Sequence, residues 1–243
     1  DTYLAAAIEF TRERDLDHLR LYATAWQANS HLHQGHWNEA EEAALAVVQS
    51  VAAATIARIM ALLALGRLRT RRGDADAREA LDQALALAEP TGALQRIAPV
   101  RAARAEAAWL NGDAARTADE ARAAYPLALA KRHAWFIGEL AYWQWKAGVL
   151  DEVPAIATEA YRLQMQHAAV QAEVAWQARN CPYEAARALA EADDEASLKC
   201  ALQVFDRLGA TPAADRTRQR LRELASAGAR ADPALSGAAT RSD

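Results

Sequence analysis

Three histidines, His31, His33 and His36, lie close together in the sequence and could bind a metal ion. Zinc takes three or four converging ligands, and carboxylates or thiolates usually support the imidazoles. On a helix, His31 and His33 would point to opposite sides, and His36 follows the turn residue Gly35. We interpret the three imidazoles as a solvated helix end, with a metal site as the alternative, and predict no metal ligand.

The only two cysteines, Cys181 and Cys200, are the remaining candidates for metal or redox chemistry. Neither has a neighbouring ligand pattern of the kind that zinc sites show. Two well-separated thiols in a chain of 243 residues also do not form a disulfide scaffold. We therefore expect both to be ordinary buried thiols.

The sequence lacks the common catalytic motifs. It has no Gly-x-x-x-x-Gly-Lys-Ser/Thr loop for a nucleotide phosphate, no Gly-x-Ser-x-Gly elbow, no His-Glu-x-x-His and no Cys-x-x-Cys. Acidic pairs such as Asp119-Glu120 suit helix starts or outer faces, whereas a general acid needs an apolar pocket that shifts its pKa. We predict no catalytic residue and no cofactor, with an all-α enzyme as an alternative.

Two stretches are rich in arginine. The first contains Arg67, Arg69, Arg71, Arg72 and Arg78, and the second contains Arg216, Arg218, Arg220 and Arg222. Alternate positions diverge around a helix, and acidic residues are interleaved, so we interpret both stretches as solvated, salt-bridged surface rather than as phosphate-contacting patches. The net charge of −4 gives no overall attraction to nucleic acid or to an anionic membrane, so we expect neither as a partner.

Aromatic residues gather in the segment before Gly148, namely Trp135, Tyr142, Trp143 and Trp145, and Trp176 follows. Positions 143 and 145 diverge around a helix, so one of these two rings must leave the core-facing side. We interpret the group as packing between helices, with a ligand wall as the alternative. Three further tryptophans are expected in the core: Trp26, Trp37 and Trp109.

The elements that must position these side chains are marked by four Gly-centred turns, at Gly35, Gly73, Gly112 and Gly148. Their spacings are 38, 39 and 36 residues, and each turn separates two apolar stretches of helical length. Glycine commonly ends a helix in the left-handed conformation, and a following Asp or Asn can cap the next helix. Helical hairpins that recur at such a period are typical of an α-solenoid.

Composition supports an all-α chain. It is 52% hydrophobic and 25% charged, with only 10 Gly and 7 Pro, and β-branched residues show no alternation of period two. About 13 helices are expected, near residues 2–13, 17–34, 37–50, 53–72, 76–88, 94–111, 113–130, 133–147, 151–164, 168–179, 182–191, 194–208 and 211–225. We predict one helical-repeat domain over 1–225 and a flexible tail or linker over 226–243.

Several strings resemble the tetratricopeptide region of large ATP-binding transcriptional regulators, the MalT-like members of the LuxR family. They are residues 66–74, 88–92, 138–143, 180–186, 201–210 and 212–214, and the resemblance covers roughly residues 17–225. Gly66, Gly73 and Pro90 also fit the frame of about 34 residues that tetratricopeptide repeats use. Where relatives carry a further Gly-Asp-Trp turn, this chain has residues 166–170 without one, which leaves that helix break uncertain.

The resemblance implies a sensor arm that would lie between an ATPase and a DNA-binding helix-turn-helix. A peptide, protein or small effector would bind its inner face and bias the attached ATPase. We expect a cytoplasmic, non-catalytic binding domain. We also expect the chain to be a fragment, because Asp1 already lies in sequence that is typical of a helix. A free-standing tetratricopeptide scaffold is the alternative, and a homo-oligomer is left open. Candidate binding residues on the inner face of the middle hairpins are Arg101, Arg104, Glu139, Trp143 and Lys146.

Overall fold

The computed structural model describes residues 2–231, and this part of the chain is helical throughout and contains no β-strand. Thirteen α-helices and one short 3₁₀ turn are described. They are α1 (Thr2–Arg12), α2 (Asp17–Gln34), α3 (Trp37–Val48), α4 (Thr55–Arg72), α5 (Ala77–Ala88), η1 (Glu89–Thr91), α6 (Leu94–Leu110), α7 (Ala114–Ala130), α8 (Ala134–Lys146), α9 (Glu159–Met165), α10 (Ala169–Gln177), α11 (Pro182–Leu189), α12 (Glu195–Leu208) and α13 (Thr211–Ala231). The prediction of an all-α fold is confirmed.

The four glycine turns lie between helices, as predicted. Gly35, Gly73, Gly112 and Gly148 all have positive φ angles, of 81°, 90°, 80° and 73°. Helix α2 packs on α3, α4 on α5 and α6 on α7, so each of the first three turns joins two helices into a hairpin. Glycine is favoured at these positions because a left-handed residue with a Cβ atom is strained.

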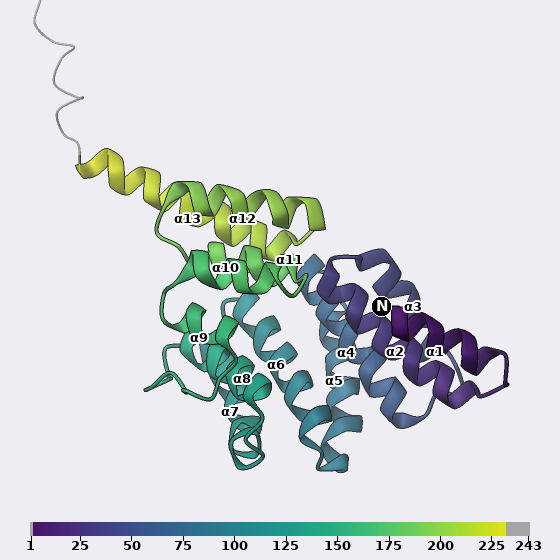
Figure 1. Cartoon of the computed structure of the whole chain (residues 1–243). Coiled ribbons are helices and arrows are strands. Elements are labelled where there is room, and N and C mark those ends of the chain that lie inside the picture. The colour runs from purple at the N-terminus through teal and green to yellow at the C-terminus, as the bar shows by residue number, and fades with distance from the viewer. Residues whose placement is uncertain (1, 232–243) are drawn as a thin grey trace, which may run out of the picture.

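Successive hairpins pack through their first helices. Helix α2 contacts α4, α4 contacts α6, and α6 contacts α8 (Figure 1). Helix α4 is enclosed by α2, α3, α5 and α6, which explains why its residues from Ile59 to Leu65 are all buried. Gly66 permits the close approach of α5, since a Cβ atom there would lie 2.5 Å from Cδ2 of Leu81.

The C-terminal helices pack against the N-terminal ones. Helix α11 contacts α2, and α13 contacts α4 (Figure 1). One buried cluster contains Leu32, Trp37 and Leu68 from the first two hairpins together with Tyr183 and Phe205 from α11 and α12. The described chain is therefore closed by contacts between residues more than a hundred positions apart, and no local pattern in the sequence predicts this closure.

The aromatic group before Gly148 packs between helices, as interpreted. Tyr161 and Trp176 make an edge-to-face contact with ring centroids 4.9 Å apart, and Trp135 lies 5.8 Å from Trp176. Trp143 is buried, whereas Trp145 is only partly buried. Trp37 is buried as expected and Trp109 partly so, but the core placement of Trp26 is wrong, because 44% of this residue is exposed.

Other differences concern helix limits. The helix expected over 151–164 is reduced to α9, Glu159–Met165. A break does follow it, with His167 at a φ of 59°, so α9 and α10 are separate helices. Helix α13 continues to Ala231, beyond the end expected near residue 225. Residues 232–243 of the predicted tail lie outside the described residues. Among the described helices, none combines the length and the apolar character that crossing a bilayer requires.

Candidate functional site

A cavity of about 800 Å³ lies where α1, α2, α4, α6 and α8 face one another, and we call it the central cavity. Its apolar lining includes Leu4, Trp26, Met60, Leu63, Trp135 and Phe136. Its polar lining includes Asn29, His33, Gln34, Arg67, Glu139 and Arg179. Ligand sites are commonly concave, mainly apolar and supplied with a few polar groups, and this cavity has that character.

Trp26 is the most informative residue of this lining. It belongs to α2, and its ring makes an edge-to-face contact with Tyr22 at a centroid distance of 6.4 Å. Nearly half of the residue remains exposed, although α2 is otherwise packed on α3 and α4. An exposed indole inside a concavity offers a ligand a large apolar contact area at little cost in conformational entropy.

An ion pair forms the polar part of the cavity wall. Arg67 of α4 donates a hydrogen bond to Glu139 of α8, and the same Nη2 donates to the carbonyl oxygen of Pro99 at 3.3 Å. Both charged residues are buried, and Arg67 Nε has no hydrogen-bond partner among the described residues. The interpretation of Arg67 as a solvated surface residue is therefore wrong.

A second buried network lies beside this pair. Arg71 Nε donates to Glu106 of α6 at 2.9 Å, and Arg71 Nη2 donates to Glu184 of α11 at 2.8 Å. The guanidinium carbon lies 3.9 Å from the centroid of the Tyr183 ring. Only 1% of Arg71 is exposed, so the surface interpretation is wrong here too. The network joins α4 to α6 and to α11, and so links the N-terminal hairpins to the C-terminal helices.

The network gives folding a dependence on pH. Burial by itself would raise the pKa of Glu106 and of Glu184. The charge of Arg71, together with other nearby cations and hydrogen bonds, outweighs burial and holds both pKa values below the usual 4.5, that of Glu184 well below. The unfolded chain therefore binds more protons than the folded chain once the pH falls below about 5. We expect the stability contributed by these carboxylates to be complete at neutral pH and to be lost as the pH falls through their folded pKa values.

Urea unfolding at pH 7, 5 and 4 measures this loss. The free energy of unfolding should fall across the series, and the fall should be smaller in Glu184→Gln, which has no carboxylate to protonate at that position. Equal slopes for the two proteins would contradict the assignment of the low pKa to Glu184.

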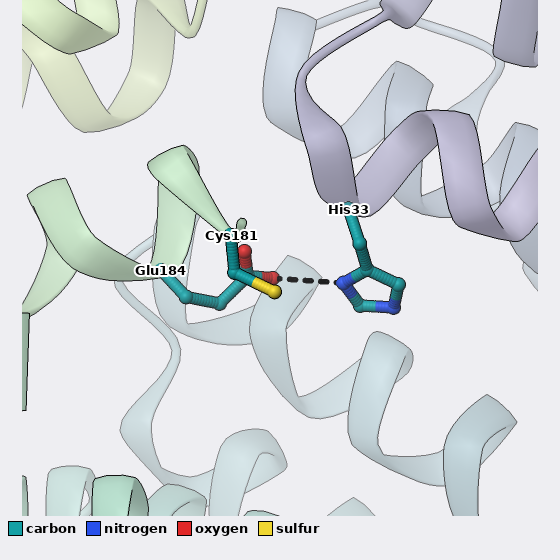
Figure 2. Close-up of side chains that lie close together, drawn as sticks. All are labelled: His33, Cys181 and Glu184. Atoms are coloured by element: carbon teal, nitrogen blue, oxygen red, sulfur yellow. Dashed lines mark ion pairs between the residues drawn. The ribbon is translucent and has the colours of Figure 1, made fainter. Parts of the chain in front are cut away.

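His33, Cys181 and Glu184 come together at the edge of the central cavity, from α2 and from the start of α11 (Figure 2). His33 Nδ1 lies 3.4 Å from Glu184 Oε1, and one donor atom of each residue lies within 4.8 Å of the others. Imidazole, thiolate and carboxylate are zinc ligands, and Glu184 Oε2 has no partner among the described residues.

Two features compete with a metal at this place. Arg71 already neutralises Glu184, and burial raises the pKa of the Cys181 thiol to about 12, so a metal would have to displace a proton. The prediction of no metal stays a prediction. No pattern in the sequence indicated this cluster, since Cys181 and Glu184 are far from His33 along the chain.

The five predicted binding residues do not form one surface. Glu139 lines the central cavity, whereas Trp143 and Lys146 line a separate cavity of about 430 Å³, which we call the C-terminal cavity. Arg101 and Arg104 instead pair with Glu120, at 2.6 Å and 2.8 Å. The five residues therefore do not line one common cavity, and their role in binding stays a prediction.

Glu120 and Cys200 also differ from expectation. Glu120 was placed at a helix start or on an outer face, but it is buried on α7 between Arg101 and Arg104. Of the two cysteines, Cys181 is buried as expected, whereas Cys200 is exposed. The sequence missed Trp26 as a cavity residue altogether, because an apolar ring on a helix gives no sign of whether another helix will cover it.

Comparison with known proteins adds nothing to this description, since no family model, no curated protein and no solved structure matches the chain. The expected kinship with MalT-like regulators therefore stays a prediction.

Proposed function

We propose that this chain is a non-catalytic binding domain whose central cavity takes a small effector or the side chains of a peptide. The fold would be a tetratricopeptide-like α-solenoid in which the first helix of each hairpin faces the ligand. One observation carries the proposal: the half-exposed indole of Trp26 inside a cavity of about 800 Å³ lined by α2, α4, α6 and α8.

The lining points to a ligand that is mainly apolar or aromatic. Trp26, Trp135 and Phe136 provide the ring surfaces, and aromatic ligands pack on such surfaces edge-to-face or in offset stacks. The Arg67–Glu139 pair is already matched in charge, so the cavity wall there offers hydrogen bonds but no excess charge. A neutral or weakly charged ligand suits this wall better than a strongly charged one.

The same cavity suggests how binding is transmitted. Trp26 belongs to the first hairpin and Trp135 to the fourth, so a ligand that touches both favours the arrangement in which these hairpins are close. Binding shifts an equilibrium only by its differential affinity for the two states. In a MalT-like regulator this shift would act on an ATPase and a helix-turn-helix attached to the domain, which is the role that the sequence resemblance implies.

Ligand screening by thermal shift, with a library of aromatic metabolites and short apolar peptides, tests the proposal. A compound that binds only the folded chain raises its melting temperature. We expect Trp26→Ala to weaken each hit at least tenfold, because an aromatic residue at the centre of a binding site commonly contributes about 2 kcal/mol.

Phe10→Ala is the matched control, since Phe10 is an exposed ring that does not line this cavity. It should leave the affinity of each hit unchanged. Hits that bind Trp26→Ala and the unchanged chain equally well would exclude the central cavity as their site.

A further inference from the structure

The C-terminal cavity lies between α6, α8, α11, α12 and α13, apart from the central cavity. Trp109, Trp143 and Phe205 contribute aromatic surface to its lining. Four cationic side chains also line it, and three of them come from three different helices: Lys146 of α8, Arg187 of α11 and Arg216 of α13.

Ring contacts hold these cations near one another. Lys146 Nζ lies 4.8 Å from the ring centroid of Trp109, and the guanidinium carbon of Arg216 lies 4.7 Å from the same ring. The guanidinium carbon of Arg187 lies 4.4 Å from the ring centroid of Tyr142, another lining residue. Trp109 therefore fixes two of the cations, and Tyr142 fixes the third.

The carboxylates of the cavity do not balance this charge. Lys146 pairs with Glu191 at 3.2 Å, but among residues 2–231 no carboxylate oxygen lies within 4.0 Å of Arg187 or of Arg216. Arg216 donates instead to the carbonyl oxygen of Trp109 at 3.1 Å. Arg187 has one long hydrogen bond, of 3.4 Å to Gln164, and its buried Nε atom has no partner in the described chain.

The other charged residues of the lining leave this excess in place. Arg220 pairs with Asp193 at 3.0 Å, and the carboxylate of Glu223 accepts a hydrogen bond from Gln219 at 2.9 Å at the exposed rim. The pKa of Lys146 is lowered, mainly by burial. Glu191 raises this pKa, whereas the positive charges of Arg187 and Arg216 lower it further. Two cations without a carboxylate partner thus stand beside a third in a partly buried space.

We propose that the C-terminal cavity binds the phosphate group of a small organic phosphate ester. Two guanidinium groups without a carboxylate within 4.0 Å among the described residues supply positive charge for an anion, and arginine donors suit phosphate oxygens. Glu106 and Glu184 lie farther off and offset only part of the charge of Arg187, whose pKa they raise. The three terminal oxygens of a phosphate can accept hydrogen bonds from three cations that approach from different helices, whereas a carboxylate offers two oxygens in one plane. The volume of about 430 Å³ exceeds what a phosphate group fills, and the aromatic lining can cover the organic part.

Phenyl phosphate, inorganic phosphate and succinate, compared at constant ionic strength and neutral pH, test this proposal on the full chain. The readouts are the melting temperature and the fluorescence of tryptophan, since Trp109 touches two of the cations. We expect saturable binding of phenyl phosphate, weaker binding of inorganic phosphate, and no saturable effect of succinate. Absence of saturation with phenyl phosphate, or equal binding of succinate, would overturn the proposal.

Arg216→Gln is the decisive variant, because among the described residues the Arg216 side chain donates a hydrogen bond only to the carbonyl oxygen of Trp109, and its loss should leave the fold intact. We expect the affinity for phenyl phosphate to fall at least tenfold in Arg216→Gln. Arg218→Gln, on the same helix, removes an arginine that pairs with Asp206 and Asp215 outside the cavity, and it should bind as the unchanged chain does. Equal losses in the two variants would mean general charge attraction and would also overturn the proposal.

Discussion

Replacing Arg71 with methionine is expected to lower the free energy of unfolding by about 3–5 kcal/mol, because it leaves two carboxylates buried without their cation. Glu106 and Glu184 both accept hydrogen bonds from this one guanidinium group, and all three side chains are almost fully buried. Methionine fills a similar volume, so the loss reports the charge rather than a cavity. Urea unfolding at pH 7 measures it.

Two further variants separate the buried network from ordinary surface pairing. Arg72→Met removes the neighbouring arginine, whose ion pair with Glu41 is partly exposed, and should cost no more than about 1 kcal/mol. The triple variant Arg71→Met, Glu106→Gln, Glu184→Gln should regain much of the lost stability, since it removes all three charges of this ion-pair network together. A loss in Arg71→Met as small as that in Arg72→Met would contradict the account.

The local features of this fold could be predicted from the sequence, because they depend on neighbours along the chain. Glycine at positions 35, 73, 112 and 148 ends a helix through its own conformational freedom, and all four turns were placed correctly. Asp113 caps α7 by accepting a hydrogen bond from the backbone of Arg116 at 2.9 Å, as the Gly-Asp pattern suggested. The shortened α9 and the longer α13 were not foreseen.

The buried arginines were missed for a different reason. Their carboxylate partners lie 35, 72 and 113 positions away, beyond any local pattern. One signal was available, since Arg67 and Arg71 are four residues apart and lie on the face of α4 that also carries the apolar residues Met60, Leu63 and Ala64. The arginines at every second position, 67, 69 and 71, instead indicated side chains that diverge around the helix, as on a solvated surface.

The candidate sites were only partly predictable. Glu139, Trp143 and Lys146 all lie on α8, within the helix expected over 133–147, but Glu139 lines one cavity and the other two residues line another. The positions of Arg187 and Arg216 in the C-terminal cavity depend on how α11 and α13 pack against α6 and α8. That packing belongs to the closure of the chain, which no helix encodes by itself.

Replacing Phe205 with alanine is expected to cost about 3–5 kcal/mol, the loss typical of a large aromatic residue removed from a core. Phe205 is 1% exposed, and its ring centroid lies 5.5 Å from that of Tyr183. It belongs to the cluster that also contains Leu32 and Leu68, so the cavity left behind would fall at the junction of the C-terminal and N-terminal helices. Urea unfolding gives the size of the loss.

Hydrogen exchange then tells whether the loss is local to that junction. If the closure is a distinct contact, amides of α11 and α12 in Phe205→Ala should exchange faster relative to those of α7, which packs on α6 and α8 and contributes no residue to this cluster. Val174→Ala is the control, because Val174 is exposed on α10 and should change stability by no more than about 0.5 kcal/mol. Faster exchange spread evenly over all helices would instead mean that the two ends of the chain fold and unfold with the rest as one unit.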